Sequence, residues 1–573
     1  MKSNIKTLLV LFCIGTACTS RDQTSTLTND FHGVIIADSK GIYINDDIFS
    51  PDQLYPKKKW QGDWIGLNKD QYDQHQETHT AWINNYKAGK SVRALFRKAF
   101  DVKELPPAAI LCITADVSFR AYVNGYFICQ GPANIGSDYD DHNPPEHWFF
   151  STHDVKKYLQ IGRNTIAVEV YTFDLALAET TSGKAKFICD LDVDLNRTLL
   201  YTDTSWKCHL DTCLTKINED LIYNAMLEIP DWKSNHFKDD HWPLASLQDA
   251  DKDGYLIQSQ IPATIRHPLK AIETWQNFPQ KEMNRHECSL FGQIFYDESC
   301  TFDFGRNMSA YYTISLMAQQ GDTVKIYPRE KSTVNRALVY ICREGKNIFT
   351  TPQLNVFRYL TVQVASREGL KIDSLYALYS SYPTRYAGSF VCSDSFYTQL
   401  WDVIRWTTQM CMNTLYLDSP RHQEPIACTG DYLIESLSNY YAFGDPWLAR
   451  QDLIKTARML KKNGYDMFHT SYSVLWVQML YNYFQYTGDN ALIKELLPHI
   501  NKLNDLFATY LDENYLLSQA PDYMFMDWIK IDKFNAHHPP AVIGMGYLTA
   551  FYYQSLILAS NFNQMHGDAD KSR

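Results

Sequence analysis

The stretch Ser393-Asp-Ser-Phe-Tyr-Thr-Gln-Leu-Trp-Asp-Val-Ile-Arg-Trp406 marks the point at which the character of the chain changes. From Phe396 onward, apolar residues recur at the spacing of an amphipathic helix, and Asp394 and Asp445 stand where N-caps belong. The region 391–573 is therefore predicted to consist of helices joined as hairpins by short loops. We expect six helices, over Phe396–Tyr416, Tyr432–Phe443, Trp447–Lys462, Tyr472–Tyr486, Ala491–Leu511 and Tyr547–Asn563.

Upstream of this region the pattern is typical of β-structure, because short alternating apolar runs are separated by Gly, Pro and Asp. In the stretch Phe119-Arg-Ala-Tyr-Val-Asn-Gly125, Asn-Gly follows a strand-like run, which predicts a hairpin. Gly321-Asp322 predicts a turn between two later strands. The predicted fold class is multidomain β and α, with two N-terminal β-sandwiches, 31–265 and 266–390, before the helices.

Composition limits the classes of partner. With 573 residues the chain is long enough for about three or four domains, and 14% of its residues are aromatic, which favours stacking on flat ligands such as sugar rings. The net charge of -11 and the lack of a basic run argue against a nucleic-acid partner. No phosphate loop, dinucleotide fingerprint or Gly-x-Ser-x-Gly elbow is present, so we expect no cofactor.

The first 18 residues are typical of an export signal. Lys2 precedes the apolar run Leu8–Ile14, and small residues lead to Cys18, as in a bacterial lipobox. Cys18 would then be lipidated, with residues 19–30 as a polar tether, and ordinary secretion is the alternative. We expect an exported bacterial protein, a periplasmic or cell-surface lipoprotein that meets the membrane only through its lipid anchor.

The 13 cysteines form no close Cys-x-x-Cys pair, so no zinc site is predicted. Most should be buried thiols, although an exported protein could form one or two disulfides, for example between Cys208 and Cys213. His537 and His538 are adjacent and would point in different directions on a helix, which makes a poor chelate. We expect no metal site.

The segment Asp418-Ser-Pro-Arg-His-Gln-Glu-Pro-Ile-Ala-Cys-Thr-Gly-Asp431 carries the chemistry that can be recognised. It places three carboxylates and Arg421 in a loop between two predicted helices, and such loops often hold active sites. Clustered carboxylates raise the pKa of at least one member, which keeps a general acid protonated at neutral pH. The alternative is that Asp418 and Asp431 only cap helices or turns.

This segment resembles the signature of the bacterial α-L-rhamnosidases, the six-hairpin glycosidases of glycoside hydrolase family 78, in which Asp-Cys-Pro-x-Arg-Asp-Glu-Arg is followed by Gly-Trp-x-Gly-Asp. The resemblance implies that Glu424 is the general acid and that Asp418 and Asp431 bind rhamnose hydroxyls and tune that acid. Arg421 and His422, in the same loop, are expected to contact substrate.

Three departures from the signature alter the expected pocket. Gln423 replaces an Asp, Pro425 replaces an Arg, and Ala427-Cys428 replaces Gly-Trp. The lost acid and arginine could change the pKa of Glu424 or the sugar preference.

The resemblance extends over nearly the whole chain. Arg97–Phe100 and Tyr122–Gly125 are similar to the family's N-terminal β-domain, Asp303–Gly305 and Phe357–Tyr359 to its second one, and Gly388–Asp394 to the entry into its (α/α)6 barrel. The helices are therefore expected to form part of such a barrel.

Three downstream residues fall where the family places pocket residues, namely Trp476, Asp527 and Trp528. The indoles would stack on the apolar face of the sugar, although a tryptophan on a helix can equally be a core residue.

An (α/α)6 barrel needs twelve helices, and about half of them are predicted here. The family's general base is a glutamate from a later loop, for which no matching motif is found, whereas an inverting glycosidase needs a second carboxylate about 6.5–9.5 Å from the first. A truncated reading frame, a shortened expressed fragment or a natural binding protein would each account for this. A half-barrel should expose apolar faces such as that of Tyr472–Tyr486, which favours oligomers or instability.

The function predicted from the sequence is that of an inverting exo-glycoside hydrolase that releases terminal α-L-rhamnose from plant or bacterial glycans or rhamnosides, inactive in this form if the base is missing. Its partner would be a rhamnose-containing oligosaccharide or glycoside. Two alternatives remain. One is a six-hairpin glycosidase with another sugar specificity, and the other is a non-catalytic surface carbohydrate-binding lipoprotein.

Overall fold

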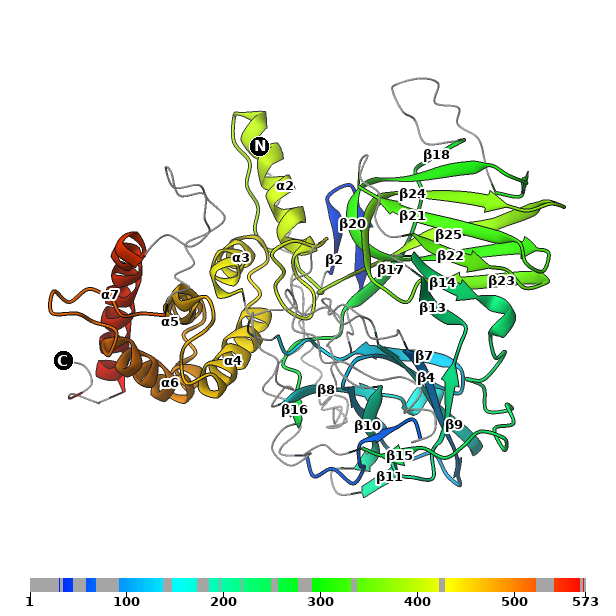
Figure 1. Ribbon diagram of the computed structural model, residues 1–573, viewed down its shortest axis with the longest axis horizontal. Helices are drawn as coiled ribbons and strands as arrows, with labels where there is room; N and C mark the ends of the chain where they lie inside the picture. Colours follow the sequence, from blue (N-terminus) through cyan, green and yellow to red (C-terminus); the bar gives the residue numbers. More distant parts are fainter. Residues whose placement is uncertain are drawn as a thin grey trace, which may run out of the picture.

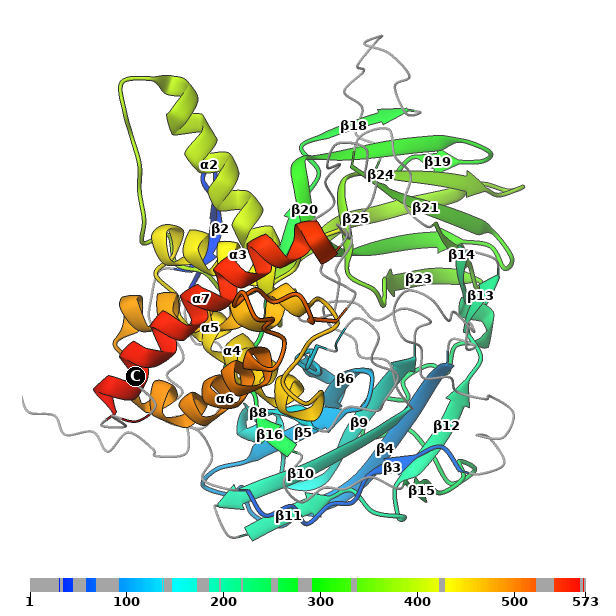
Figure 2. The same cartoon turned by 60° about the vertical axis from the view of Figure 1, so that its left-hand side comes forward.

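The protein consists of two β-rich units followed by a helical unit, as Figure 1 and the turned view in Figure 2 show. The predicted mixed β and α class is therefore confirmed. The computed structural model describes residues 30, 34–44, 58–68, 92–136, 138, 147–172, 185–194, 197–217, 220–248, 256–276, 291–330, 337–421, 428–521, 541–566 and 570.

The first β unit is a pair of sheets that enclose a common core. One sheet has seven strands, in the order β15-β3-β10-β5-β8-β16 with β11 on β10, and the other has five, in the order β12-β4-β9-β6-β7. Alternate side chains such as Ile113, Phe119 and Val168 point inward and are fully buried between the two sheets. The strands are β3 (Ile65–Gly66), β4 (Val92–Val102), β5 (Ile110–Ala115), β6 (Ser118–Val123), β7 (Tyr126–Gly131), β8 (Trp148–Asp154), β9 (Gly162–Thr172), β10 (Lys186–Asp194), β11 (Arg197–Tyr201), β12 (Lys207–Asp211), β15 (Ser246–Leu247) and β16 (Leu256–Gln258).

The predicted hairpin connects β6 and β7. Asn124 has φ 51° and Gly125 has φ 85°, the two positive values that a two-residue hairpin turn requires. Val123 pairs with Tyr126 directly across this turn. The prediction from Asn-Gly is confirmed.

The second β unit is built on one eleven-stranded sheet, in the order β13-β14-β22-β21-β24-β20-β25-β17, with β18 and β23 on β20 and β19 on β25. Its longest strand, β20, changes register between Asp303 and Met308, where Gly305 has φ 86°. The strands are β13 (Leu214–Ile217), β14 (Asp220–Asn224), β17 (Ile265–Lys270), β18 (Glu273–Gln276), β19 (Ile294–Phe295), β20 (Ser299–Ala318), β21 (Thr323–Arg329), β22 (Leu338–Ile341), β23 (Gly345–Thr350), β24 (Asn355–Ala365) and β25 (Leu370–Ser381), and β1 (Ile35–Asp38) and β2 (Gly41–Ile44) form a separate hairpin.

The boundary between the β units differs from the predicted one at 265/266. Strands β13 and β14 precede it, yet they belong to the second sheet, because β14 pairs in parallel with β22. Tyr223 stacks on Tyr340 with ring centroids 5.5 Å apart, which buries both rings. The chain then returns to the first unit through β15 and β16.

Six helices lie among the described residues of the C-terminal region, in the predicted order. Asp394 Oδ1 accepts a hydrogen bond from Phe396 N at 2.9 Å and caps the first of them. Asp445 Oδ1 accepts one from Trp447 N at 3.0 Å, although the formal N-cap is Pro446. The helices are α2 (Ser395–Met410), α3 (Thr429–Ala442), α4 (Trp447–Lys462), α5 (Thr470–Thr487), α6 (Asn490–Ala508) and α7 (Ala541–Met565).

The helices form two rows. Helix α5 packs between α3 and α7, while α4 and α6 contact each other and also α5. Gly430 at the start of α3 lies against Tyr472 at the start of α5, and Tyr440 near the end of α3 lies against Tyr486 near the end of α5, so α3 and α5 begin at the same end of the helical unit. Loops that precede these two helices are thereby brought together.

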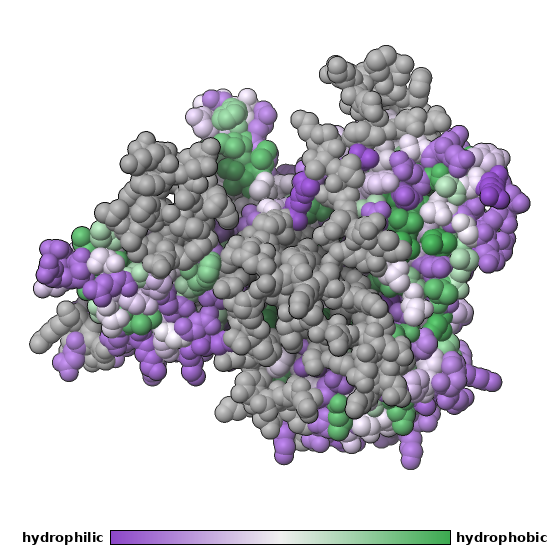
Figure 3. Space-filling model, in the orientation of Figure 1, coloured by the Kyte–Doolittle hydropathy of each residue, from purple (hydrophilic) through white to green (hydrophobic). Residues whose placement is uncertain are grey.

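The exposed apolar faces lie on other helices than expected. Helix α5, which covers the predicted Tyr472–Tyr486 segment, buries Val474, Val477 and Leu480 in the core of the helical unit. Apolar side chains are exposed instead along α2 and α7, for example Phe396 at 63% and Tyr553 at 64%. Figure 3 shows the α2 part of this surface as a hydrophobic projection.

The ten cysteines in the described part of the chain are free thiols, and nine of them are buried. The suggested Cys208–Cys213 disulfide is therefore wrong. The Cys213 sulfur accepts a hydrogen bond from Arg93 Nη1 at 3.1 Å instead, and Cys208 lies in β12 in the core between the two sheets of the first unit. None of the described helices is long and apolar enough to span a bilayer.

A buried ionic network stabilises the first unit and gives a stability prediction. Arg93 Nη2 lies 2.6 Å from Glu169 Oε2, and its Nη1 lies 2.7 Å from Asp211 Oδ2. Arg93→Leu strands both buried carboxylates and should lower the free energy of unfolding by about 3–5 kcal/mol. Denaturant unfolding followed by tryptophan fluorescence measures this.

Arg197→Leu is the matched control, because that side chain is 67% exposed and its partner Asp194 lies 3.6 Å away. It should change the free energy of unfolding by less than about 1 kcal/mol. Equal effects of the two substitutions would contradict the role assigned to the buried network.

Candidate active site

The predicted catalytic loop joins α2 to α3, and the structure describes both of its ends. Asp418 and Arg421 lie in the part that leaves α2, and Asp431 lies in the first turn of α3. Four of the predicted site residues lie outside the described residues, namely His422, Glu424, Asp527 and Trp528, and so does Cys18.

A rigid turn after α2 positions Asp418. Leu417 N donates to Cys411 O at 2.9 Å, and Met412 pairs with Tyr416 as an isolated bridge. Tyr416 is fully buried, and its hydroxyl accepts a hydrogen bond from Asn439 Nδ2 of α3 at 2.7 Å. The main chain is therefore fixed directly before Asp418, which is itself half-buried.

Asp431 is positioned by close contact between α3 and α5. A Cβ added to Gly430 would lie 2.5 Å from Tyr472 Cε1, so only glycine lets the Tyr472 ring approach the start of α3 this closely. The Tyr472 hydroxyl then donates to Asp431 Oδ2 at 3.3 Å, and its ring stacks on His469 with centroids 5.1 Å apart. The positive end of the α3 dipole also favours a carboxylate here.

Sequence reasoning missed a second carboxyl group of α3, that of Glu435. It lies one helical turn after Asp431, on the same face of the helix, and this four-residue spacing is the signal that could have revealed it. Its Oε2 is buried and has no hydrogen-bond partner among the described residues. The Cys411 thiol at the end of α2 is hydrogen-bonded to the same carboxyl group.

The surroundings of the Glu435 carboxyl group favour its neutral form. Burial raises the pKa of Glu435 well above its ordinary value, and the charges of Asp431, Asp452 and Asp418 raise this pKa further, against a smaller opposing effect of the Cys411 hydrogen bond. Within the acidic cluster of Asp418, Asp431 and Glu435, Glu435 is therefore the member whose surroundings favour the protonated form. This is the property that a general-acid site needs.

A second titratable carboxyl group, that of Asp466, lies at the same end of the helices. It precedes α5, and it accepts hydrogen bonds from the Tyr510 hydroxyl at 2.9 Å and the Ser473 hydroxyl at 3.1 Å. Burial is the largest cause that raises the pKa of Asp466, to about 6. The sequence analysis did not single out this residue, because no motif surrounds it.

Arg421 contacts the second β unit. Its Nη1 lies 3.0 Å from Glu330 Oε2, next to the end of β21, and its side chain is 45% exposed. The guanidinium group therefore joins the catalytic loop to the β-sheet, a role that the sequence did not indicate.

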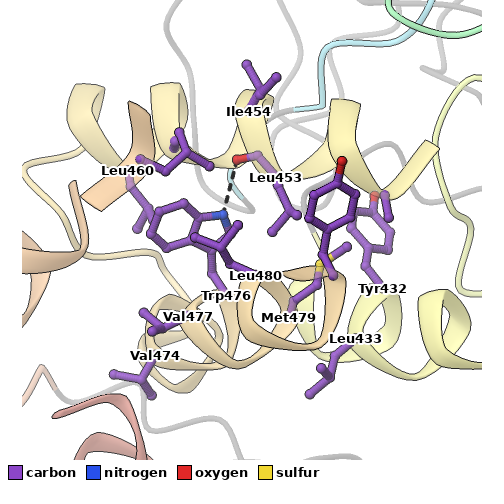
Figure 4. Packing of buried hydrophobic residues seen from close by; sticks show 14 of the residues in the cluster. Tyr432, Leu433, Leu453, Ile454, Leu460, Val474, Trp476, Val477, Met479 and Leu480 are labelled. Carbon is purple, nitrogen blue, oxygen red and sulfur yellow. Dashed lines mark hydrogen bonds between the residues drawn. The ribbon is translucent and has the colours of Figure 1, made fainter. Parts of the chain in front are cut away.

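Trp476 corrects the prediction of a substrate-stacking indole. It is fully buried, and its indole N–H donates to the carbonyl oxygen of Leu453 at 3.1 Å. Figure 4 shows the ring beside Leu453 and Leu460, in the core of the helical unit. The ring is fully buried in this core, so the core alternative describes Trp476. Within the described ranges no group of His, Cys, Asp and Glu could hold a metal ion.

Two family models match the chain. The bacterial α-L-rhamnosidase six-hairpin glycosidase domain matches residues 385–573, and the α-L-rhamnosidase N-terminal domain matches residues 106–267. The first match contains the acidic cluster and all six described helices.

Curated relatives agree with these matches. Two α-L-rhamnosidases of Formosa agariphila are 21% and 22% identical to this chain, over 60% and 66% of its length. The matched regions cover only 38% and 40% of those proteins, so the chain spans about two fifths of the length of these relatives.

Solved structures show the same fold. The family 78 rhamnosidase of Bacillus sp. GL1 superposes with a TM-score of 0.72 at 17% identity, over 90% of this chain and 75% of that one. The α-L-rhamnosidase of Streptomyces avermitilis, solved in complex with L-rhamnose, gives a TM-score of 0.64 at 16% identity, over 84% and 48%.

The neutral state of Glu435 predicts a pH-dependent stability. Unfolding exposes this carboxyl group, whose pKa then returns to about 4.3, so between that pH and its raised folded pKa the folded chain binds more protons than the unfolded chain. Each further pH unit therefore costs the folded state up to about 1.4 kcal/mol. Glu435→Gln removes this cost, and the variant should gain stability over the unchanged chain as pH rises from about 5 to about 8.

Urea denaturation at several pH values measures the difference. Glu495→Gln is the control, because this exposed glutamate of α6 should give a difference that does not change with pH. A pH-independent difference for Glu435→Gln would show that this carboxyl group is ionised in the folded chain.

Proposed function

The chain belongs to the family of bacterial α-L-rhamnosidases, and we propose that it carries the general-acid side of an inverting exo-glycosidase that releases terminal α-L-rhamnose from plant or bacterial glycans. The observation that supports this most is the acidic cluster of Asp418, Asp431 and Glu435, at the end of the helical unit where the family signature lies. The activity is that of a glycoside hydrolase.

Glu424 is the proposed general acid. It lies between Asp418 and Asp431 in the sequence, and both of these carboxylates already raise the pKa of the neighbouring Glu435. The same charges would raise the pKa of Glu424 and keep it protonated at neutral pH. The acid then donates its proton to the glycosidic oxygen as the bond to the anomeric carbon breaks.

Inversion requires a second carboxylate that takes a proton from water on the opposite face of the sugar. Helix α6 ends next to the loop that leads into α5, where Tyr510 donates to Asp466, and Asp527 follows α6 in the sequence. Asp527 is the base that we propose if this chain alone turns over substrate.

Rhamnose is the proposed sugar, supported by the structural similarity to the Streptomyces avermitilis enzyme that was solved with L-rhamnose. Gln423, Pro425 and Cys428 replace residues of the family signature, so a related deoxysugar or hexose is the alternative that a substrate panel tests.

We also propose that the protein is exported and anchored to a bacterial membrane through a lipid on Cys18. The leader pattern of residues 1–18 supports this proposal. Expression in a bacterial host with labelled palmitate should label the unchanged chain, while Cys18→Ser should be unlabelled. Equal labelling of the two proteins, or none in either, would contradict lipidation at Cys18.

Release of nitrophenol from nitrophenyl α-L-rhamnopyranoside tests the catalytic proposal. Glu424→Gln should lower kcat by about 10²–10⁴-fold, because the variant cannot donate a proton. Glu368→Gln, the same change at an exposed site in the second β unit, should leave kcat unchanged. NMR spectra recorded during the reaction should show β-rhamnose as the first anomer to form.

Three outcomes are informative. Release of α-rhamnose first contradicts inversion, and full activity of Glu424→Gln contradicts its role as the acid. The third outcome is a folded chain that binds rhamnosides, with or without Glu424, but releases no product. This outcome would support the carbohydrate-binding alternative.

A further inference from the structure

A cavity lies at the opposite end of the helices from the acidic cluster. It has a volume of about 540 Å³ and lies between the last turns of α3 and α5 and the first turns of α4 and α6. We call it the back pocket. Its lining includes Gln260, Tyr440, Trp447, Arg450, Tyr486 and Asp489.

The back pocket is separate from the acidic cluster. Tyr440 follows Asp431 by nine positions on α3, which places the two residues about 14 Å apart along the helix axis. Gln260 comes from the segment between β16 and β17, so the back pocket also lies where the β-rich part meets the helices, a common location for ligand sites.

Aromatic rings form one wall of the back pocket. The Tyr440 and Tyr486 rings have centroids 4.6 Å apart, and Tyr486 is 46% exposed, so part of its ring is open to solvent. Trp447 contributes an indole that is only partly buried. Exposed aromatic faces next to polar groups are suited to the apolar face of a sugar ring.

Paired polar groups form another part of the lining. Arg450 Nε lies 3.2 Å from Asp489 Oδ2, which also accepts a hydrogen bond from the Tyr483 hydroxyl at 3.0 Å. Arg450 Nη1 donates to Gln260 Oε1 as well. These contacts hold the donors and acceptors in place before a ligand arrives, which lowers the entropy cost of binding.

The charge balance selects for a neutral ligand. The described lining residues include one cation, Arg450, and one anion, Asp489, and these two are paired with each other, so a phosphate or an ammonium group would find no unpaired countercharge among them. The Tyr440 hydroxyl is buried beside Ser436, so it adds no charge to the lining.

We propose that the back pocket is a second saccharide-binding site, which takes a neutral sugar with one ring face on Tyr486 and Trp447 and its hydroxyls on Arg450, Asp489 and Gln260. The choice of a rhamnose-containing glycan as the ligand rests on the proposed function. The assignment of a saccharide site rests on the geometry of the back pocket. Such a site would hold a glycan chain near the enzyme and raise its local concentration at the catalytic end.

Calorimetric titration with the disaccharide α-L-rhamnosyl-(1→6)-D-glucose tests this in the full chain, with Glu424→Gln present in every protein so that no sugar is hydrolysed. Tyr486→Ala and Trp447→Ala should each weaken one binding event at least tenfold. Tyr553→Ala, the same change at an exposed tyrosine of α7, should leave binding unchanged. Thermal melting followed by circular dichroism confirms that each variant is folded.

Asp431→Asn distinguishes the two ends of the helices. The binding event that Tyr486→Ala weakens should persist in Asp431→Asn, even if nitrophenyl rhamnoside is never hydrolysed and the proposed function fails. Binding of cellobiose with the same dependence on Tyr486 also supports the site, as a general saccharide site.

The proposal is overturned if neither disaccharide binds, or if the Tyr486 and Trp447 variants bind as tightly as the unchanged chain. It is equally overturned if the binding that depends on Tyr486 disappears in Asp431→Asn, because the sugar would then occupy the catalytic end.

Discussion

The close contact between the start of α3 and the ring of Tyr472 on α5 is the constraint on which both proposed sites depend. Gly430 allows the approach, since any side chain there would collide with the ring. The contact fixes α3 and α5 side by side in the same direction, so Asp431 meets the Tyr472 hydroxyl at one end. At the other end the same packing brings Tyr440 onto Tyr486 and opens the back pocket beside them. The pair of helices α3 and α5 therefore positions both the acidic cluster and the back pocket.

Two buried acidic groups of this protein show how differently burial can be balanced. Glu169 in the first β unit is surrounded by Arg93 and other cations, which outweigh its burial and hold its pKa below the ordinary value. The described surroundings of Glu435 are acidic instead, because the charges of Asp431, Asp452 and Asp418 add to its burial in raising its pKa. The cost of removing a charge from water is then avoided by keeping the proton. The first arrangement stabilises a fold, and the second stores a proton where acid catalysis needs one.

Local signals in the sequence predicted local structure well. Trp447–Lys462 was predicted as a helix with the bounds that α4 has, and Asn124-Gly125 gave the hairpin, because capping and turn chemistry act within a few residues. Long-range packing could not be read in this way. Trp476 has the same periodicity whether it faces a sugar or the core, and only the tertiary structure shows its indole N–H on Leu453. Glu435 was missed because its unusual state comes from burial, which no short motif encodes.

The catalytic end also depends on the β-rich part of the chain. Asp138, which comes from the N-terminal part, accepts hydrogen bonds from Phe468 N at 3.0 Å and from Asn463 Nδ2 at 2.6 Å, and so fixes the loop that leads into α5. Arg421 binds Glu330 at the edge of the second β unit and fixes the start of the catalytic loop. Each contact restrains a loop from outside the helical unit. The β units therefore act as a support that orients the loops around the acidic cluster, and a helical unit isolated from them would lose that orientation even if its own core remained packed.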